Sequence, residues 1–353
     1  MHLTNGQERC LEGEMGEPLA WALARLVRLG DEFDSPGLLP VASVHIPDWD
    51  VASRRDRILS LGSEGLATRC SLNPGRPLTD GSPLPTGLLD VRTCTPYLCG
   101  QTVSRDSVVA WGGRAACAFV NSALGARSEM ESYEDALASA VSGLTPERGL
   151  HRDEGRRATV AVLIDTPEVD LAALGAGISA SLSGEVPQIC GLRVGLGGFK
   201  KLAFAINCQG DMPLFHVAPE RRAPDGVEAI YSSQIATGSD GRLDADLLIL
   251  GCPHLSEQEV NGWARALADR PVGIMTWFFI SALCSDKSPK TGEVLGCRGR
   301  VNVDRCPLSF KDEMRGRKVA CTSPGLVACL AVAGVDAFLV TDDEALDMML
   351  GKV

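Results

Sequence analysis

Three cysteines in the sequence stand where an apolar or turn-forming run ends beside a proline. Cys94 lies in RTCTPYLCGQ (92–101), Cys252 follows DLLILG, and Cys306 follows VNVDR. Proline stiffens the backbone next to each of them. Thiolates are preferred ligands of iron–sulfur clusters, copper(I) and zinc, so three such residues can form a three-point metal site. The wide spacing leaves an alternative open, because free cysteine is also a common core residue. For Cys94, half of a disulfide is a further alternative.

The cysteine count favours free thiols. The chain has 13 cysteines, an odd number that excludes complete internal pairing. Its first residues, MHLTNGQERC, lack the basic and apolar regions of a secretory signal, so we expect a cytoplasmic protein with reduced cysteines. A CxxC pair, which would favour a zinc ribbon or a dithiol redox site, does not occur in the sequence.

Charge and hydropathy exclude two classes of partner. The formal net charge is -11 and the sequence pI is about 5.0, so the overall field does not attract nucleic acid. The sequence contains no run of eighteen apolar residues, so we expect no membrane span.

The predicted elements that position these cysteines are alternating strands and helices. In the N-terminal part, LLPVASVHIP (38–47) is predicted to form one buried strand with His45 near its end. Residues 107–127 have too many small side chains for a prediction by periodicity, but are expected to be buried. A charged segment, TPERGLHRDEGRRA, follows at 145–158 and is predicted to be a connector.

Residues after this connector predict parallel sheets. TVAVLIDT is predicted as a strand and VDLAALGAGISASLSG as a helix, followed by KKLAFAINCQG (200–210) and PLFHVA as strands. From residue 244 onward, strand-like and helix-like runs alternate to the C-terminus. Strand–helix–strand order favours an α/β fold of several βαβ units. We predict three domains, covering 1–155, 156–225 and 226–353, with Cys94 in the first and the other two cysteines in the third.

In such sheets, ligands bind beyond the carboxyl ends of the strands. Cys252 and Cys306 both follow predicted strands, which places them at such an edge. After Cys252, Ser256 and Glu259 have the spacing of a helix capping box.

The chain resembles the large subunit of the aconitase X family, the DUF521-type hydro-lyases, from residue 2 to its end. The similar segments occur in the family's order: LTNGQERCLEGEMGEPLAWALARLVRLG, SVHI, LNP, RTCTPYLCG, AWG, FVNSALGARS, GLHRDEGRR, LGCPHLSEQE and VDRC. The resemblance implies an aconitase-like fold, with mostly parallel sheets that converge on an iron–sulfur site. It also implies that Cys94, Cys252 and Cys306 hold the cluster, with [4Fe-4S] favoured over [2Fe-2S].

The family's known members dehydrate cis-3-hydroxyproline or phosphorylated mevalonate. The resemblance therefore implies a lyase that removes water from a small hydroxylated carboxylic acid, with an open cluster iron as Lewis acid. The chain ends without the family's small swivelling domain, which implies a separate small subunit as partner. An alternative is a diverged cluster-binding member that binds or isomerises a ligand without dehydrating it. A third reading is an α/β enzyme without metal.

Further site residues follow from the matched motifs. Ser43 and His45 match a Ser-x-His element, with His45 as a proton donor to the leaving hydroxide. The NSxLGAR motif is matched by Asn121, Ser122 and Arg127. Ser122 is a candidate catalytic residue, whereas Asn121 and Arg127 are candidate substrate contacts, because arginine binds carboxylates in a bidentate fork. The alternatives are a structural histidine, packing and a surface arginine. Cys99, Cys117 and Cys329 are predicted core residues.

Two departures from the family affect the substrate. Members usually read AWGESSA, where this chain has AWGGRAA with Arg114, and TNSGK with a histidine three residues later, where it has Thr322, Ser323 and then Cys329. Arg114, Thr322 and Ser323 are therefore predicted substrate contacts, with Arg114 as a substitute positive charge. Because the replaced groups made different hydrogen bonds, we expect a hydroxy acid other than the two known substrates.

Overall fold

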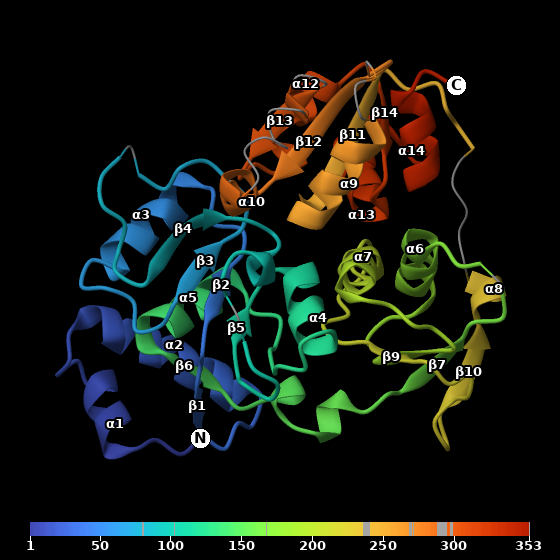
Figure 1. Cartoon of the computed structure of the whole chain (residues 1–353). Helices are drawn as coiled ribbons and strands as arrows, with labels where there is room; N and C mark the ends of the chain where they lie inside the picture. The colour runs from blue at the N-terminus through green and yellow to red at the C-terminus, as the bar shows by residue number, and fades with distance from the viewer. Residues whose placement is uncertain are drawn as a thin grey trace. The chain divides into compact units, whose positions relative to one another are not determined.

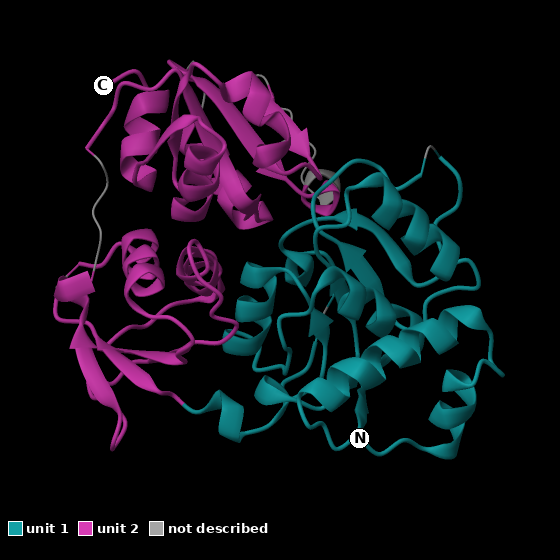
Figure 2. Cartoon of the chain, turned by 180° about the vertical axis from the view of Figure 1, so that it is seen from behind, with its two compact units in different colours: residues 1–157 teal, residues 158–353 magenta. Residues whose placement is uncertain are grey.

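The structure, a computed structural model, describes residues 1–79, 81–101, 103–166, 168–235, 241–267, 270, 272–287, 295–296 and 299–352. These residues form two compact units, Met1–Arg157 and Ala158–Val353 (Figure 2). The boundary between the units falls inside the predicted charged connector. The predicted α/β class with mostly parallel sheets is confirmed, because ten of the eleven strand pairings described below are parallel.

The first unit is built around one parallel sheet. Its helices and strands are α1 (Asn5–Leu11), α2 (Glu17–Glu32), β1 (Leu38–Pro40), β2 (Val44–Ile46), α3 (Ala52–Leu61), β3 (Cys70–Leu72), β4 (Leu88–Arg92), η1 (Pro96–Leu98), β5 (Ala110–Trp111), α4 (Arg114–Ser122), α5 (Tyr133–Ser142), β6 (Leu144–Pro146), η2 (Gly149–His151) and η3 (Glu154–Arg156). The sheet has the order β4-β3-β2-β5.

One prediction in this unit is wrong. Residues 38–47 do not form a single strand, because β1 pairs antiparallel with β6 and β2 pairs in parallel with β3 and β5. The chain changes sheets between Pro40 and Val44, so the apolar run serves two short strands. The undecided stretch 107–127 forms β5 and helix α4, and most of α4 is buried as expected.

Helices cover the sheet of the first unit on both faces. Side chains of α2, α3 and α5 pack with β2 and β3 in one apolar cluster that includes Leu26, Ile58 and Leu137. A second cluster joins Trp111 of β5 to Ala116 and Val120 of α4. Helices therefore pack against both faces of this sheet.

The second unit contains two parallel sheets (Figure 1). Elements of the first are β7 (Val160–Leu163), α6 (Leu171–Ser181), β8 (Pro187–Cys190), α7 (Leu196–Ile206), β9 (His216–Ala218), β10 (Glu228–Tyr231) and α8 (Ser232–Ile235). Its strand order is β10-β7-β8-β9, with α6 and α7 side by side on one face. β10 follows the predicted boundary at residue 225, yet it pairs with β7 in this sheet.

The predicted strand at 200–210 is wrong, since residues 196–206 form helix α7. Phe199, Leu202, Ala203 and Ile206 are spaced i, i+3, i+4 and i+7, which is the spacing of one helix face. Three of them are buried in the structure, and Phe199 is half-buried. The central LAFAI segment is continuously apolar, as in a buried strand, but the spacing of its buried residues is that of a helix.

The other sheet has the order β13-β12-β11-β14-β15, and all its strands are parallel. Its elements are β11 (Leu247–Leu255), α9 (Glu257–Leu267), β12 (Met275–Ile280), α10 (Ala282–Lys287), β13 (Arg300–Val303), η4 (Pro307–Phe310), α12 (Lys311–Met314), β14 (Lys318–Cys321), α13 (Pro324–Val332), β15 (Asp336–Leu339) and α14 (Asp342–Met349). The predicted strands and helices of this region are present. Residues 268, 269 and 271, at the ends of a predicted helix and strand, lie outside the described residues.

Alternate residues of these strands face opposite layers. Leu248, Leu250 and Phe278 pack against α9 and α14 in one cluster. Leu247, Ile249 and their neighbours pack against η4, α12 and α13 in the other. This period of two, with helices on both faces, is the doubly wound arrangement whose ligand sites lie beyond the carboxyl ends of the strands.

Candidate functional site

In the first unit, the predicted residues gather at the carboxyl edge of the sheet. The strands β2, β3, β4 and β5 are mutually parallel, so the segments that follow them emerge at one edge. Those segments carry Asn73 after β3, Cys94 after β4 and Arg114 after β5, while His45 lies in β2 beside its end. The sequence therefore places a thiol, an imidazole and a guanidinium along a single rim.

Cys94 lies between the end of β4 and the helical turn η1. Its thiol is half-buried. The neighbouring side chains, Thr93 and Thr95, are buried and their hydroxyls are 2.9 Å apart, within hydrogen-bond distance. The backbone N–H of Thr95 also donates to Thr93 Oγ1. These bonds hold the backbone on both sides of Cys94 at the rim.

His45 is fully buried and hydrogen-bonded through both ring nitrogens. Its Nδ1 lies 2.8 Å from Ser71 Oγ and its Nε2 lies 2.8 Å from Asn73 Oδ1. An amide oxygen can only accept, so we assign the ring proton to Nε2, and the hydroxyl of Ser71 then donates to Nδ1. Burial lowers the pKa of His45 to about 4, and its hydrogen bonds oppose this shift only in part. The resting imidazole is therefore neutral.

Acid should destabilise the protein through His45. Between pH 6.5 and 4 the unfolded chain binds a proton that the folded ring excludes, so stability falls as the pH falls through this range. Between pH 7 and pH 5 we expect this single residue to contribute a loss of about 2 kcal/mol. Urea unfolding at both pH values should show that His45→Gln loses correspondingly less stability than the wild type.

The matched control is His2→Gln, since His2 is exposed. His2→Gln should have the pH dependence of the wild type. If His45→Gln and the wild type lose the same stability between pH 7 and pH 5, His45 is not the neutral buried imidazole described above.

The other predicted residues of the first unit have structural partners. Ser43 is buried and its hydroxyl oxygen accepts from Trp111 Nε1 at 3.0 Å. Asn121 is buried too; its amide donates to Ser128 O and accepts from Ser128 N and Arg156 Nη1. Ser122 is half-buried and Arg114 is exposed. Their contacts with substrate stay predictions.

Arg127 is engaged by its neighbours. Its guanidinium donates to the carboxylates of Asp106 and Asp153 and to the backbone oxygen of His151. The carboxylate-binding fork therefore already holds two carboxylates of the protein. A substrate carboxylate at this position would have to displace one of them.

In the second unit, the carboxyl edge of the five-stranded sheet carries the remaining predicted residues. Cys252 lies within the last residues of β11, Cys306 follows β13, and Thr322 and Ser323 follow β14. Because these strands are parallel, all four residues lie at one edge. Ser323 is buried and caps α13, accepting from the N–H of Leu326, whereas Thr322 is half-buried.

Cys252 lies in a bulge of β11. Leu250 pairs with Phe278 and Leu255 with Ile280, so β11 advances from 250 to 255 while β12 advances only from 278 to 280. The extra residues lie outside the regular ladder, and they include Gly251 and Cys252. Bulges next to functional sites commonly redirect a side chain. The Cys252 thiol is half-buried and its peptide bond to Pro253 is cis.

Cys306 occupies the N-cap position of the helical turn η4. Burial raises the pKa of its thiol to about 11, whereas hydrogen bonds from the backbone N–H groups of Leu308 and Ser309 lower it. Backbone donors of this kind also stabilise a metal-bound thiolate and tune iron–sulfur clusters. The position therefore suits a cluster ligand.

Two residues at these edges had no role in our sequence-based predictions. Asn73, in the LNP segment, bonds to His45 and also accepts from Trp49 Nε1 through its backbone oxygen. His254 follows Cys252 by two residues in GCPH and is buried. Burial lowers the pKa of His254 to about 4. Both residues lie in segments that carry the family resemblance, which is the signal that could have identified them.

Of the three predicted core cysteines, two are buried and one is exposed. Cys99 and Cys117 are buried as predicted, but Cys329 is exposed on α13, so that prediction is wrong. Leu326 and Leu330 of this helix are buried on its inner side, whereas Val332 and Cys329 are exposed. A fully apolar helix sequence does not reveal which of its sides faces the core.

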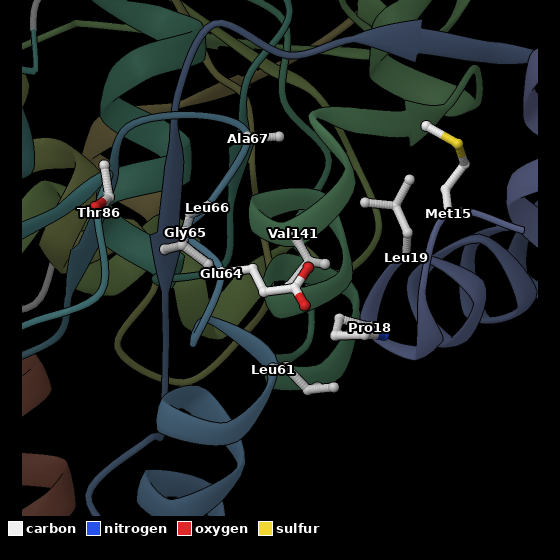
Figure 3. A pocket seen from close by; sticks show the side chains of 10 residues that line it. All are labelled: Met15, Pro18, Leu19, Leu61, Glu64, Gly65, Leu66, Ala67, Thr86 and Val141. Carbon is white, nitrogen blue, oxygen red and sulfur yellow. The ribbon is translucent and has the colours of Figure 1, made fainter. Parts of the chain in front are cut away.

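A pocket of about 300 Å³ in the first unit lies away from the predicted residues (Figure 3). Its lining is mainly apolar and comes from Met15, Pro18, Leu19, Leu61, Glu64, Gly65, Leu66, Ala67, Thr86 and Val141. None of the predicted site residues lines this pocket. It is therefore not the site that the sequence predicts.

The described residues contain neither a metal-binding group of three side chains nor a membrane-spanning helix. No three His, Cys, Asp or Glu side chains there are grouped closely enough to hold a metal ion. No helix among them is both long and apolar enough to cross a membrane. Cys252 and Cys306 lie at one edge of the five-stranded sheet, and their role as metal ligands stays a prediction.

Comparisons with known proteins agree on one family. The family model described as "Aconitase X first domain" matches residues 84–154. The phosphomevalonate dehydratase large subunit of Thermococcus kodakarensis is 31% identical over 318 residues, which cover 80% of this chain and 81% of that protein. The cis-3-hydroxy-L-proline dehydratase of Pseudomonas aeruginosa is 30% identical over 191 residues, 47% of this chain and 33% of that enzyme.

A solved structure matches almost the whole chain. The crystal structure of Thermococcus kodakaraensis aconitase X in its holo-form superposes with a TM-score of 0.84 at 26% identity, and covers 99% of both chains. Its fold agrees with the predicted aconitase-like architecture.

Proposed function

Because this chain belongs to the aconitase X family, we propose that it is the large subunit of an iron–sulfur-dependent hydro-lyase. The proposed reaction removes water from a small hydroxylated carboxylic acid. The observation that carries the proposal is the placement of Cys94, Cys252 and Cys306, each beside the carboxyl end of a parallel strand. The dehydratase names of the relatives support the same reaction class.

The cysteines fit an iron–sulfur cluster by their chemistry. All three thiols are half-buried, and hydrogen bonds fix the segments of Cys94 and Cys306. Thiolates are the usual protein ligands of such clusters, and three of them leave one iron of a cubane cluster open. We propose a [4Fe-4S] cluster, with [2Fe-2S] as the alternative. When bound, it would supply a Lewis acid for the substrate hydroxyl.

His45 is proposed to handle the proton of the leaving hydroxide. Its neutral ring carries a proton on Nε2, held by Asn73. An imidazolium is the stronger donor, and a substrate carboxylate beside the ring would raise the pKa of His45 by supplying negative charge. Ser71 and Asn73 orient the imidazole in both protonation states. Ser43 and Ser122 are proposed to make hydrogen bonds to the reacting groups.

Arg114 is proposed to bind the substrate carboxylate. It is exposed in the first turn of α4, at the same edge as His45 and Cys94. Arg127 is the second candidate, but its guanidinium is already engaged with two carboxylates. Asn121, Thr322 and Ser323 complete the proposed substrate contacts. The residues at these positions favour a hydroxy acid distinct from hydroxyproline and phosphomevalonate.

We propose a small subunit as partner and the cytoplasm as location. The relatives named as large subunits support a two-subunit enzyme. The odd number of cysteines, 13, suits a reducing compartment in which they stay thiols.

The test is anaerobic co-expression of this chain with its candidate small subunit, followed by a screen of hydroxy acids for loss of water. Iron and sulfide should be present together with dehydration of at least one substrate. Cluster without dehydration would favour the diverged cluster-binding protein. Absence of both iron and sulfide would contradict the proposed function.

A further inference from the structure

The two thiol-bearing loops of the second unit belong to strands that are not neighbours. The sheet order is β13-β12-β11, so β12 separates the strand of Cys252 from that of Cys306. At a spacing of about 4.8 Å between neighbours, β11 and β13 lie roughly 9.6 Å apart. Two ligands of one cluster need a fixed separation, so something must set the distance between these loops.

One side chain connects the two loops across the end of β12. The imidazole Nε2 of His254, from the bulge that carries Cys252, lies 2.9 Å from the backbone oxygen of Arg305. A carbonyl oxygen only accepts, so Nε2 carries the proton and donates. Arg305 immediately precedes Cys306. The bond therefore joins His254, two residues after Cys252, to Arg305, the residue before Cys306.

The surroundings make this bond rigid. His254 is 1% exposed, so water does not compete for its proton. The Cys306 loop is held independently by Asp304, which is buried, accepts from the N–H of Ala282 at 2.7 Å and donates its own N–H to Ile280 O. Asp304 thus joins the ends of β12 and β13, whereas His254 joins those of β11 and β13.

We propose that His254 is the positioning residue that holds Cys252 and Cys306 at the separation required by the cluster. This inference rests on the proposed function, because it assumes that both thiols bind the same cluster. Residues that orient metal ligands in this way typically change metal affinity about 10- to 100-fold when replaced. Loss of the His254 bond should therefore loosen the cluster more than it loosens the fold.

The test compares His254→Leu with His254→Gln. Leucine fills the space but cannot donate, whereas the glutamine amide places an N–H near the position of Nε2. For anaerobically purified protein we would measure iron and sulfide per chain and the rate of iron release to a chelator. His254→Leu should release iron at least about 10-fold faster than the wild type, and His254→Gln should stay near the wild-type rate.

Two controls separate this role from general destabilisation. Thermal unfolding of the cluster-free variants should stay close to that of the wild type. His151→Gln replaces another buried histidine, in the first unit, and should leave the rate of iron release unchanged. If His254→Leu does not fold, His254→Asn serves instead, because its shorter amide does not reach Arg305.

The outcomes are distinguishable. Wild-type iron release in a folded His254→Leu or His254→Asn variant would overturn the inference and leave the proposed function intact. The inference also fails if His254→Gln loses iron as fast as the variant that lacks the bond. A wild-type protein that binds neither iron nor sulfide would overturn the proposed function, and this inference with it.

Discussion

Cys252→Ala is expected to abolish both cluster binding and dehydration. The substitution removes one of three proposed ligands, so iron and sulfide should fall well below the wild-type content. Loss of a Lewis acid removes several kcal/mol of transition-state stabilisation, which corresponds to a rate at least about 10³-fold lower. The measurements are iron and sulfide analysis and the rate of water loss from whichever hydroxy acid the wild type accepts.

The matched control is Cys190→Ala in β8 of the same unit. Cys190 is a buried cysteine of the same unit, but it belongs to the other sheet. Cys190→Ala should keep its iron, and its activity should be near that of the wild type. Turnover that survives Cys252→Ala would show that Lewis-acid chemistry at this thiol is not the mechanism.

Gly251→Ala is expected to have the largest effect on stability. Gly251 has φ +100°, a region that residues with a Cβ rarely adopt, and a Cβ at this position would overlap the carbonyl oxygen of Phe279. Strain and overlap together should lower the stability of the second unit by about 3 kcal/mol. For a unit of this size, the Tm should fall by roughly 6–12 °C.

Because Gly251 precedes Cys252, this variant should also lower the iron content. Gly262→Ala is the control, because it replaces a glycine whose position accepts a Cβ. Gly262 lies in α9, and a Cβ there meets no atom within 4 Å. Alanine is the better helix former by about 1 kcal/mol, so Gly262→Ala should be neutral or stabilising. Equal melting temperatures for Gly251→Ala and the wild type would contradict the strain at Gly251.

Much of the second unit could be predicted from its sequence because its strands are short apolar runs between turn-forming residues. The apolar residues of DLLILG are buried on both faces, as in a parallel strand enclosed by helices, and in the edge strand DAFLV Phe338 and Val340 are buried. The capping box of Ser256 and Glu259 was also predicted, and both of its hydrogen bonds are present. The rule that ligands bind at carboxyl ends then placed Cys252 and Cys306 at one edge.

The wrong predictions concern residues whose surroundings in the fold are not determined by the local sequence pattern. Helix α7 is apolar enough to resemble a strand, and only the spacing of its buried residues shows its period. The exposure of Cys329 depends on which neighbours cover α13, and the short-range sequence does not contain that information. Likewise, the partners of Asn121 and Arg127 come from residues up to 35 positions away, beyond any motif.

The choice of the three cysteines came from the family resemblance and not from sequence periodicity. Three thiols separated by more than 50 residues carry no spacing signal, and only their place in the family motifs selects them from 13 cysteines. The hydrogen bond between His254 and Arg305 joins two of these motifs, but the sequence shows only that both are present.

Strand β10 has a consequence for how the chain can be divided. It lies beyond the boundary predicted at residue 225, yet its backbone pairs with β7 along Glu228–Tyr231. A fragment that stopped before β10 would leave the N–H and C=O groups of β7 unpaired on one side, and exposed strand edges of this kind promote aggregation. The second unit therefore needs residues 228–231 to keep the sheet that contains β7 from self-association.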